Sequence, residues 1–207
     1  QGAIARIGLQ LAEGLAAAHA AQILHRDIKP SNILLAWSGR SLLLDFNLSS
    51  DAAATTQGVG GTLAYMAPEI IESVLTDNGR AAKQFDPRFD IYSLGVVLFE
   101  LLTGELPAKP ENADKLPIDA YEPWLDCKRG PIATLADGGK CDAINQPLFD
   151  IVKKCQAFNP AERYATAEEL VQALHGYLES CKPAEVVQNP PTRGAIPTRR
   201  FTLRVAL

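Results

Sequence analysis

The segment His25-Arg26-Asp27-Ile28-Lys29-Pro30-Ser31-Asn32 brings a carboxylate, an ammonium group and a carboxamide together in one short stretch of chain. A second carboxylate, Asp45, follows in Leu44-Asp45-Phe46-Asn47. A carboxylate can take a proton from a hydroxyl group, an ammonium group can neutralise phosphate charge, and carboxylate and amide oxygens are ligands of Mg²⁺. The two stretches together therefore indicate chemistry on a phosphate ester.

The sequence on either side of this segment predicts elements that would hold it in place. Apolar residues recur at helical spacing over residues 2–22, so a helix should lead into the segment. After it, apolar runs at 32–36 and 41–44 surround a glycine-containing turn and predict a small β-hairpin. The hairpin would begin at Asn32 and end at Asp45, so that both side chains could face one cleft.

The remainder of the chain predicts further helices. Residues 89–103 are apolar almost all round and are followed by Gly104, so they should form a helix in the core of a larger domain. The other expected elements are a polar mobile loop over 49–61, a helix from Pro68 to about Ser73, loops with one short helix over 105–145, a helix over 148–158, and a helix after the capping box that opens at Thr166. The proline-rich residues 182–207 predict a disordered tail, which leaves residues 1–181 as the domain.

Composition narrows the class of protein. Of the 207 residues, 47% are hydrophobic and 21% are charged, which suits a globular core, and the net charge of -4 gives no basic surface for nucleic acid. No apolar run approaches the roughly 20 residues of a membrane span, and no signal peptide is visible. The four cysteines form no C-x-x-C pair, so reduced thiols and a cytoplasmic location are expected. His19 and His175 are expected to be solvated.

The opening segment resembles the catalytic loop of protein kinases, the H-R-D-x-K-P-x-N pattern. Four more stretches resemble motifs of that family in the right order: Asp45-Phe46-Asn47, Gly61-Thr62 through Ala67-Pro68-Glu69, Asp90-Ile91-Tyr92-Ser93-Leu94-Gly95, and Asn159-Pro160-Ala161-Glu162-Arg163-Tyr164. Lys29, two residues after Asp27, marks the serine/threonine type, and the character of the sequence is bacterial. The resemblance covers about residues 1–181. It implies a mainly α fold, the helical large lobe of the protein kinase fold, with a small β-hairpin at the catalytic loop.

The resemblance also implies roles for the residues at the centre. Asp27 would accept or orient the hydroxyl proton of a Ser or Thr in a protein substrate, and Lys29 would neutralise the transferring phosphoryl group. Asn32 and Asp45 would hold Mg²⁺ ions that bridge the phosphates of ATP, and Leu34 would pack under the adenine. The implied activity is phosphorylation of Ser or Thr with ATP and Mg²⁺ as cofactors.

Two further groups of residues follow from the resemblance. In the activation segment, Arg26 would receive a phosphate carried by Thr55 or Thr56. Thr62 would tie Asp27 to the peptide-binding loop. The second group is structural. His25 and Phe46 would pack in the internal spine of the lobe, and Asp90 would hold the backbone of the catalytic loop. Glu69 and Arg163 would form a buried ion pair.

Two departures from the family pattern bear on the expected activity. Asn47 stands where the family has Gly, a mild change because Asn is the next most tolerant residue at positive φ. The sequence also contains no Gly-rich loop, V-A-I-K lysine or partner glutamate of a small lobe. The chain is therefore expected to be the large lobe alone, and nearly or wholly inactive by itself.

Three alternatives remain open at this point. The chain could be a truncated kinase-like module that binds a partner or regulates a complete kinase and performs no catalysis. The expected protein partners are a missing small lobe or a partner kinase. The chain could also be a partial sequence, which a start at Gln1 inside a helix favours. An aminoglycoside-type phosphotransferase would use an Asp and an Asn in the same way, but it would not have Lys29 together with Ala67-Pro68-Glu69.

Overall fold

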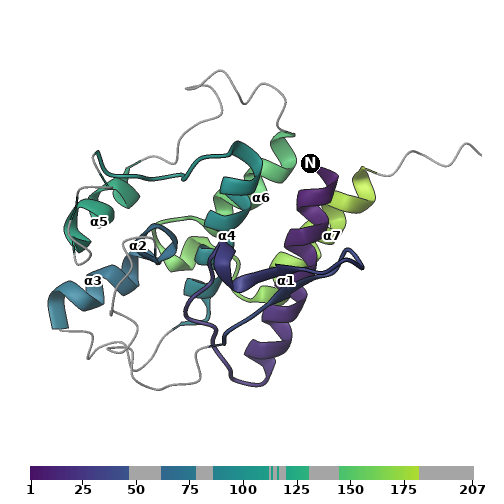
Figure 1. Ribbon diagram of the computed structural model, residues 1–207, viewed down its shortest axis with the longest axis horizontal. Helices are drawn as coiled ribbons and strands as arrows, with labels where there is room; N and C mark the ends of the chain where they lie inside the picture. Colours follow the sequence, from purple (N-terminus) through teal and green to yellow (C-terminus); the bar gives the residue numbers. More distant parts are fainter. Residues whose placement is uncertain are drawn as a thin grey trace, which may run out of the picture.

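The computed structural model describes residues 1–46, 62–77, 86–111, 113, 116, 120–130 and 145–181 (Figure 1). Within these residues the chain is mainly helical with one two-stranded antiparallel sheet, as the sequence predicts. The elements are α1 (Gly2–Ala20), β1 (Ile33–Leu35), β2 (Ser41–Leu43), α2 (Thr62–Tyr65), α3 (Pro68–Asp77), α4 (Arg88–Thr103), α5 (Tyr121–Arg129), α6 (Gln146–Cys155) and α7 (Ala167–Ser180). None of the described helices combines the length and the apolar character that crossing a bilayer requires.

Helix α4 lies at the centre of the fold because its sequence is apolar on nearly every side. Its residues from Phe89 to Phe99 are all buried, and the helix packs against α1, α2 and α6. It is followed by Gly104, which has a φ of 77° and donates its N–H to the Glu100 carbonyl oxygen at 2.8 Å. Gly takes this left-handed conformation without a steric penalty, which is why the sequence marks the end of the helix.

The main core forms between α1, α4, α6 and α7. Helices α1 and α7 lie side by side, and α4 packs against α1 (Figure 1). Gly95 permits the contact between α4 and α6, because a Cβ at this position would lie 2.5 Å from the Cβ of Cys155. Any larger residue at position 95 would therefore push the two helices apart.

A second, smaller cluster joins α2, α3 and α5, which lie together on the left of Figure 1. Leu63 and Ala64 of α2, Ile71 of α3, and Trp124 and Leu125 of α5 are almost fully buried in it. The cluster holds α2 against α5 although α2 is only four residues long.

The hairpin pairs Ile33 with Leu43 and Leu35 with Ser41 in antiparallel register. Gly39 in the connecting turn has a φ of 79°. Glycine adopts this left-handed conformation without a steric penalty, which agrees with the turn predicted at this position. Strand β2 packs against α1, so the hairpin is anchored to the main core on one side. The chain segments that enter and leave the hairpin consequently run next to each other.

The helix boundaries differ from the sequence prediction in a few places. α1 ends at Ala20 instead of residue 22, and α3 continues to Asp77 instead of ending near Ser73. Helix α2 was not predicted, because a single turn has little stability of its own and here depends on packing against α5. The predicted loop over 49–61 lies outside the described residues, and so does the predicted tail over 182–207.

The predicted cap of the last helix is present. The Thr166 hydroxyl oxygen accepts a hydrogen bond from the Glu169 N–H at 3.3 Å. The Glu169 carboxylate reaches back and accepts from the Ala165 N–H at 2.9 Å. The two bonds satisfy backbone donors that the helix cannot satisfy internally, so α7 begins at a residue that the sequence determines.

Candidate active site

The backbone at the start of the opening segment is held by a carboxylate from α4. Asp90 is fully buried, and its two oxygens accept hydrogen bonds from the N–H groups of His25 and Arg26, each at 2.9 Å. The same carboxylate contacts His19 Nε2 at 2.9 Å, and the His19 side chain is nearly buried. The prediction that His19 is solvated is therefore wrong, because a partner 71 residues away in sequence covers it. His175 is largely exposed, as predicted.

His25 connects the opening segment to the chain that leaves the hairpin. Its Nδ1 accepts from the Asp27 N–H at 3.3 Å, so we assign the ring proton to Nε2, which then donates to the Leu44 carbonyl oxygen at 2.9 Å. The ring also packs against Phe46, with the ring centroids 4.6 Å apart. Both ring nitrogens are thus engaged with backbone groups, which gives this buried histidine a structural role.

Asp27, Lys29 and Asn32 form one connected group. The Asp27 Oδ2 atom lies 2.7 Å from Lys29 Nζ and accepts from Asn32 Nδ2 at 3.1 Å. Asn32 Nδ2 also donates to the Asp27 backbone oxygen at 2.8 Å, and Asn32 is 7% exposed. The side chains of Asp27 and Lys29 are 23% and 21% exposed, so the buried amide orients a carboxylate that reaches the surface.

Asp45 lies near this group but is not bound to it. The Leu44 N–H donates to the Asn32 carbonyl oxygen at 2.8 Å, which places Asp45 one residue beyond that contact. Asp45 is exposed, and its carboxylate makes no hydrogen bond or ion pair with another residue in the described part of the chain. Asp45 and Arg26 both have positive φ values, 57° and 68°, an uncommon conformation for residues other than Gly.

The oxygens of this site could supply part of the coordination shell of a hard cation. Asn32 Oδ1 and the Asp45 carboxylate are acceptor atoms that could bind Mg²⁺, and Asp45 has no competing partner among the described residues. Those residues contain no group of three or more His, Cys, Asp and Glu side chains that could hold a metal without help. This donor set fits Mg²⁺, which is usually held by one or two carboxylates together with water and substrate phosphates.

Leu34 lies on β1 with its side chain 46% exposed. Leu35, Trp37, Leu42 and Leu44 are also exposed along the hairpin and its ends, so this element presents an apolar surface to solvent. Such a surface could contact the flat face of an aromatic ligand or the apolar side of a partner.

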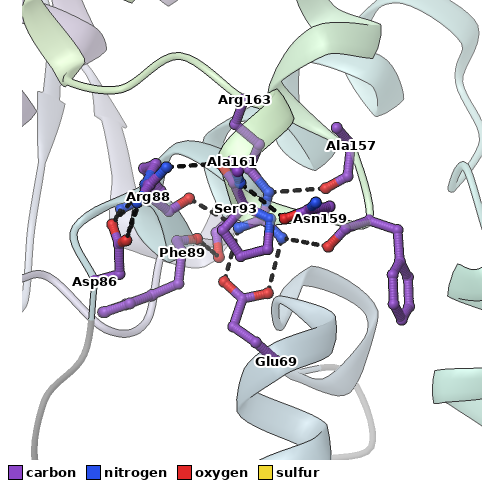
Figure 2. A network of polar contacts seen from close by, with 11 residues as sticks. Glu69, Asp86, Arg88, Phe89, Ser93, Ala157, Asn159, Ala161 and Arg163 are labelled. Atoms are coloured by element: carbon purple, nitrogen blue, oxygen red, sulfur yellow. Dashed lines mark hydrogen bonds and ion pairs between the residues drawn. The ribbon is translucent and has the colours of Figure 1, made fainter.

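The Glu69 and Arg163 side chains meet in a network of polar contacts, as Figure 2 shows. Each terminal nitrogen of Arg163 donates to one oxygen of the Glu69 carboxylate at 2.7 Å. Its remaining N–H groups donate to the backbone oxygens of Ala157, Arg88 and Phe158 at 2.8, 3.1 and 3.1 Å. The Arg163 side chain is 0% exposed and that of Glu69 is 26% exposed, so the arginine end of the pair is the buried one.

Several residues named from the sequence have no described surroundings. Thr55, Thr56 and Asn47 lie outside the described residues. Thr62 begins α2, but the position of its side chain is not described.

Two polar contacts of α2 were not anticipated from the sequence. The Tyr65 hydroxyl donates to the Glu100 carboxylate at 2.7 Å, and burial together with this hydrogen bond raises the pKa of Tyr65. The Lys128 ammonium of α5 donates to the Ala64 carbonyl oxygen at 2.8 Å. Pro68, four residues after Ala64, has no N–H to donate, so the sequence could have indicated that this carbonyl needs another donor. The neighbouring sequence does not indicate that Lys128 supplies it.

Comparison with known proteins gives a consistent result. A family model described as protein kinase domain matches residues 1–175. Serine/threonine-protein kinase PknL of Mycobacterium tuberculosis is 42% identical over 159 residues, covering 74% of this chain and 35% of the relative. Serine/threonine-protein kinase A of Synechocystis sp. is 40% identical over 189 residues, covering 82% and 32%. Serine/threonine-protein kinase PrkC of Bacillus subtilis is 34% identical over 165 residues, covering 78% and 23%. The chain thus spans about a third or less of the length of these relatives.

Proposed function

This chain belongs to the protein kinase family, and we propose that the protein containing it transfers the terminal phosphoryl group of ATP to Ser or Thr hydroxyls of proteins. The observation that carries this proposal is the geometry of Asp27. One of its carboxylate oxygens is held by Lys29 and Asn32, while the side chain reaches the surface. The names of the similar proteins support the choice of Ser and Thr as acceptors.

In the proposed reaction Asp27 accepts or orients the proton of the acceptor hydroxyl group. Lys29, 2.7 Å from Asp27, neutralises charge on the phosphoryl group as it moves, and Asn32 fixes the orientation of the carboxylate. Asn32 Oδ1 and Asp45 would hold Mg²⁺, which supplies positive charge at the phosphates when it is bound. Asp90 and His25 keep the backbone of the loop in place.

The nucleotide and the regulatory phosphate are assigned as part of the same proposal. Leu34, half exposed on β1, would contact the adenine of ATP. Arg26 would bind a phosphate carried by Thr55 or Thr56, and Thr62 would contact Asp27. We also propose that residues 1–181 form the domain, that residues 182–207 form a tail, and that the protein is cytoplasmic.

We further propose that residues 1–207 do not transfer phosphate when they are isolated. The sequence contains neither a Gly-rich loop nor a V-A-I-K lysine, which in protein kinases position the phosphates of ATP. Because positioning contributes most of the catalysis in phosphoryl transfer, the residues around Asp27 would be insufficient. The exposed apolar surface of the hairpin, which includes Leu35 and Trp37, would then contact a small lobe or a partner kinase.

Transfer of labelled phosphate from ATP to a generic basic protein tests both proposals. In the longest protein encoded by the gene, Asp27→Asn should reduce the rate of transfer by about 10²–10⁴-fold, the usual contribution of a general base. Asp126→Asn is the matched control, because Asp126 is an exposed aspartate on α5 that pairs with Arg129, and it should leave the rate unchanged.

An equal effect of the two substitutions would contradict the role of Asp27. Isolated residues 1–207 should show no transfer above the Asp27→Asn background. Robust transfer by the isolated chain that Asp27→Asn abolishes would show that the proposed inactivity is wrong. Capture of a full-length kinase by the isolated chain would favour the alternative, in which the chain binds and regulates another kinase.

A further inference from the structure

The backbone of α2 has a carbonyl group that its own helix cannot satisfy. Ala64 lies in the last turn of α2, where carbonyl oxygens have no donor within the helix. Even a longer helix would not supply one, because the residue four positions after Ala64 is Pro68. Proline has no N–H, and Ala64 is 3% exposed, so water has little access to this part of the chain. A buried carbonyl group without a donor is destabilising. The Lys128 ammonium supplies the donor at 2.8 Å.

Lys128 is an unusual lysine because the protein buries it. It is 7% exposed, and its Nζ lies 5.3 Å from the centre of the Tyr92 ring and 5.9 Å from that of Trp124. The aromatic faces offer partial compensation for the lost water, but neither of them accepts a strong hydrogen bond. The Ala64 carbonyl oxygen is therefore the principal acceptor of Lys128 among the described residues.

Lys128 thereby connects three elements at one point. Its own helix is α5, the carbonyl it binds belongs to α2, and the Tyr92 ring belongs to α4. Apolar contacts of Leu63 with the α5 residues hold α2 in the second cluster, but they do not determine the direction of its backbone. A hydrogen bond to a carbonyl oxygen is directional, so Lys128 can determine that direction.

We propose that Lys128 is a positioning residue that fixes residues 62–68 in the orientation in which they receive the acceptor peptide. The inference rests on the proposed function, in which Thr62 would tie Asp27 to the loop that binds the acceptor peptide. Lys128 itself touches neither substrate nor nucleotide. It acts through the backbone of α2, so its loss weakens the binding of the protein substrate and leaves the binding of ATP as it was.

Amide hydrogen exchange on residues 1–207 tests the contact without any assay of activity. In Lys128→Met, which keeps the apolar stem and removes the donor, the amides of residues 62–67 should exchange about tenfold faster, as expected for the loss of one charge-assisted hydrogen bond. Lys128→Arg retains a donor and should restore most of the protection. Lys154→Met is the matched control, because Lys154 also lies over a tyrosine ring, Tyr164, at 4.3 Å but is exposed on α6.

Steady-state kinetics of the longest encoded protein test the consequence for the substrate. Lys128→Met should raise KM for the protein substrate about tenfold, with KM for ATP and kcat within about twofold of wild type. Lys128→Arg should recover most of the lost affinity, and Lys154→Met should change nothing.

Unchanged exchange over residues 62–67 in Lys128→Met would overturn the inference, and so would a loss confined to kcat or a failure of Lys128→Arg to restore KM. A wild-type protein without transfer activity would instead refute the proposed function. In that case the exchange experiment still decides whether Lys128 holds α2.

Discussion

Arg163 and Lys128 are two buried cations that contact the same aromatic ring. Arg163 lies 4.8 Å from the centre of the Tyr92 ring, and Lys128 lies 5.3 Å from it. The guanidinium group of Arg163 donates to the Glu69 carboxylate and to backbone oxygens, so its charge is matched by an opposite charge. The ammonium group of Lys128 has a neutral carbonyl oxygen and two aromatic rings.

This difference shows how burial acts on a charge with a counterion and on a charge without one. Arg163 has an anion at 2.7 Å, so it can serve as a permanent anchor. For Lys128, burial lowers the pKa from the ordinary value of 10.5 to about 7. The lysine can therefore lose its proton near neutral pH.

The largest expected effect concerns the anchor. Glu69→Ala should lower the free energy of unfolding by about 3–5 kcal/mol, because it leaves the fully buried Arg163 without its counterion. Urea unfolding followed by circular dichroism measures this loss. Glu72→Ala is a control on the same helix, since Glu72 forms an exposed pair with Arg129 and should cost about 1 kcal/mol or less. Equal losses in the two variants would mean that burial of Arg163 contributes nothing.

The next effect concerns the pH dependence contributed by Lys128. Because the pKa is about 7 in the folded chain and near 10.5 in the unfolded chain, the unfolded state binds more protons in this window. Stability should therefore rise with pH between these values and fall as pH approaches 7. The difference in unfolding free energy between wild type and Lys128→Met should change by at most about 1.4 kcal/mol per pH unit.

Comparison with Lys128→Met isolates this contribution from other groups that face the ammonium. Those groups are the Cys127 thiol beside it on α5, the Glu69 carboxylate on α3, and Tyr92 on α4 with Arg163 next to it. All of them are retained in the methionine variant. Urea unfolding of both proteins at pH 7.5, 8.5 and 9.5 measures the difference, and parallel stability curves would rule out titration of Lys128 in this window.

The smallest effect is expected at the candidate active site. Asp27 and Lys29 form an ion pair in which both side chains keep about a fifth of their surface in solvent, whereas Arg163 is fully buried. Asp27→Asn leaves no fully buried charge without a partner, so it should lower the unfolding free energy by only about 1 kcal/mol. Thermal unfolding measures the change. A loss as large as that of Glu69→Ala would place Asp27 with the anchors of the fold and would weaken the case for a catalytic role.

Local sequence patterns predicted the elements whose causes are local. The all-round apolar character of α4, Gly104 after its end and the Thr166 cap each depend on residues within a few positions, and all three are present. The hairpin follows from its turn glycine and flanking apolar runs. The loop that contains Asp27 was found differently, from its resemblance to one of five protein kinase motifs that follow one another in the right order.

What the sequence did not reveal depends on partners far along the chain. His19 was expected to face water, but Asp90 lies over it from another helix. Lys128 was not singled out, because lysine is almost always at the surface and only the packing of α5 against α2 buries this one. Helix α2 was missed for the same reason, since its single turn is stabilised by packing against α5 rather than by its own residues.

The close approach of Gly95 to Cys155 encloses a thiol group between α4 and α6. Burial raises the pKa of Cys155 to about 12, whereas Cys181 is exposed just after α7. Since the thiolate is the reactive form, an alkylating reagent should modify Cys181 readily and reach Cys155 only in molecules whose two helices have separated. The rate at which Cys155 is alkylated therefore reports how often α4 and α6 separate, and the rate at the exposed Cys181 serves as the reference.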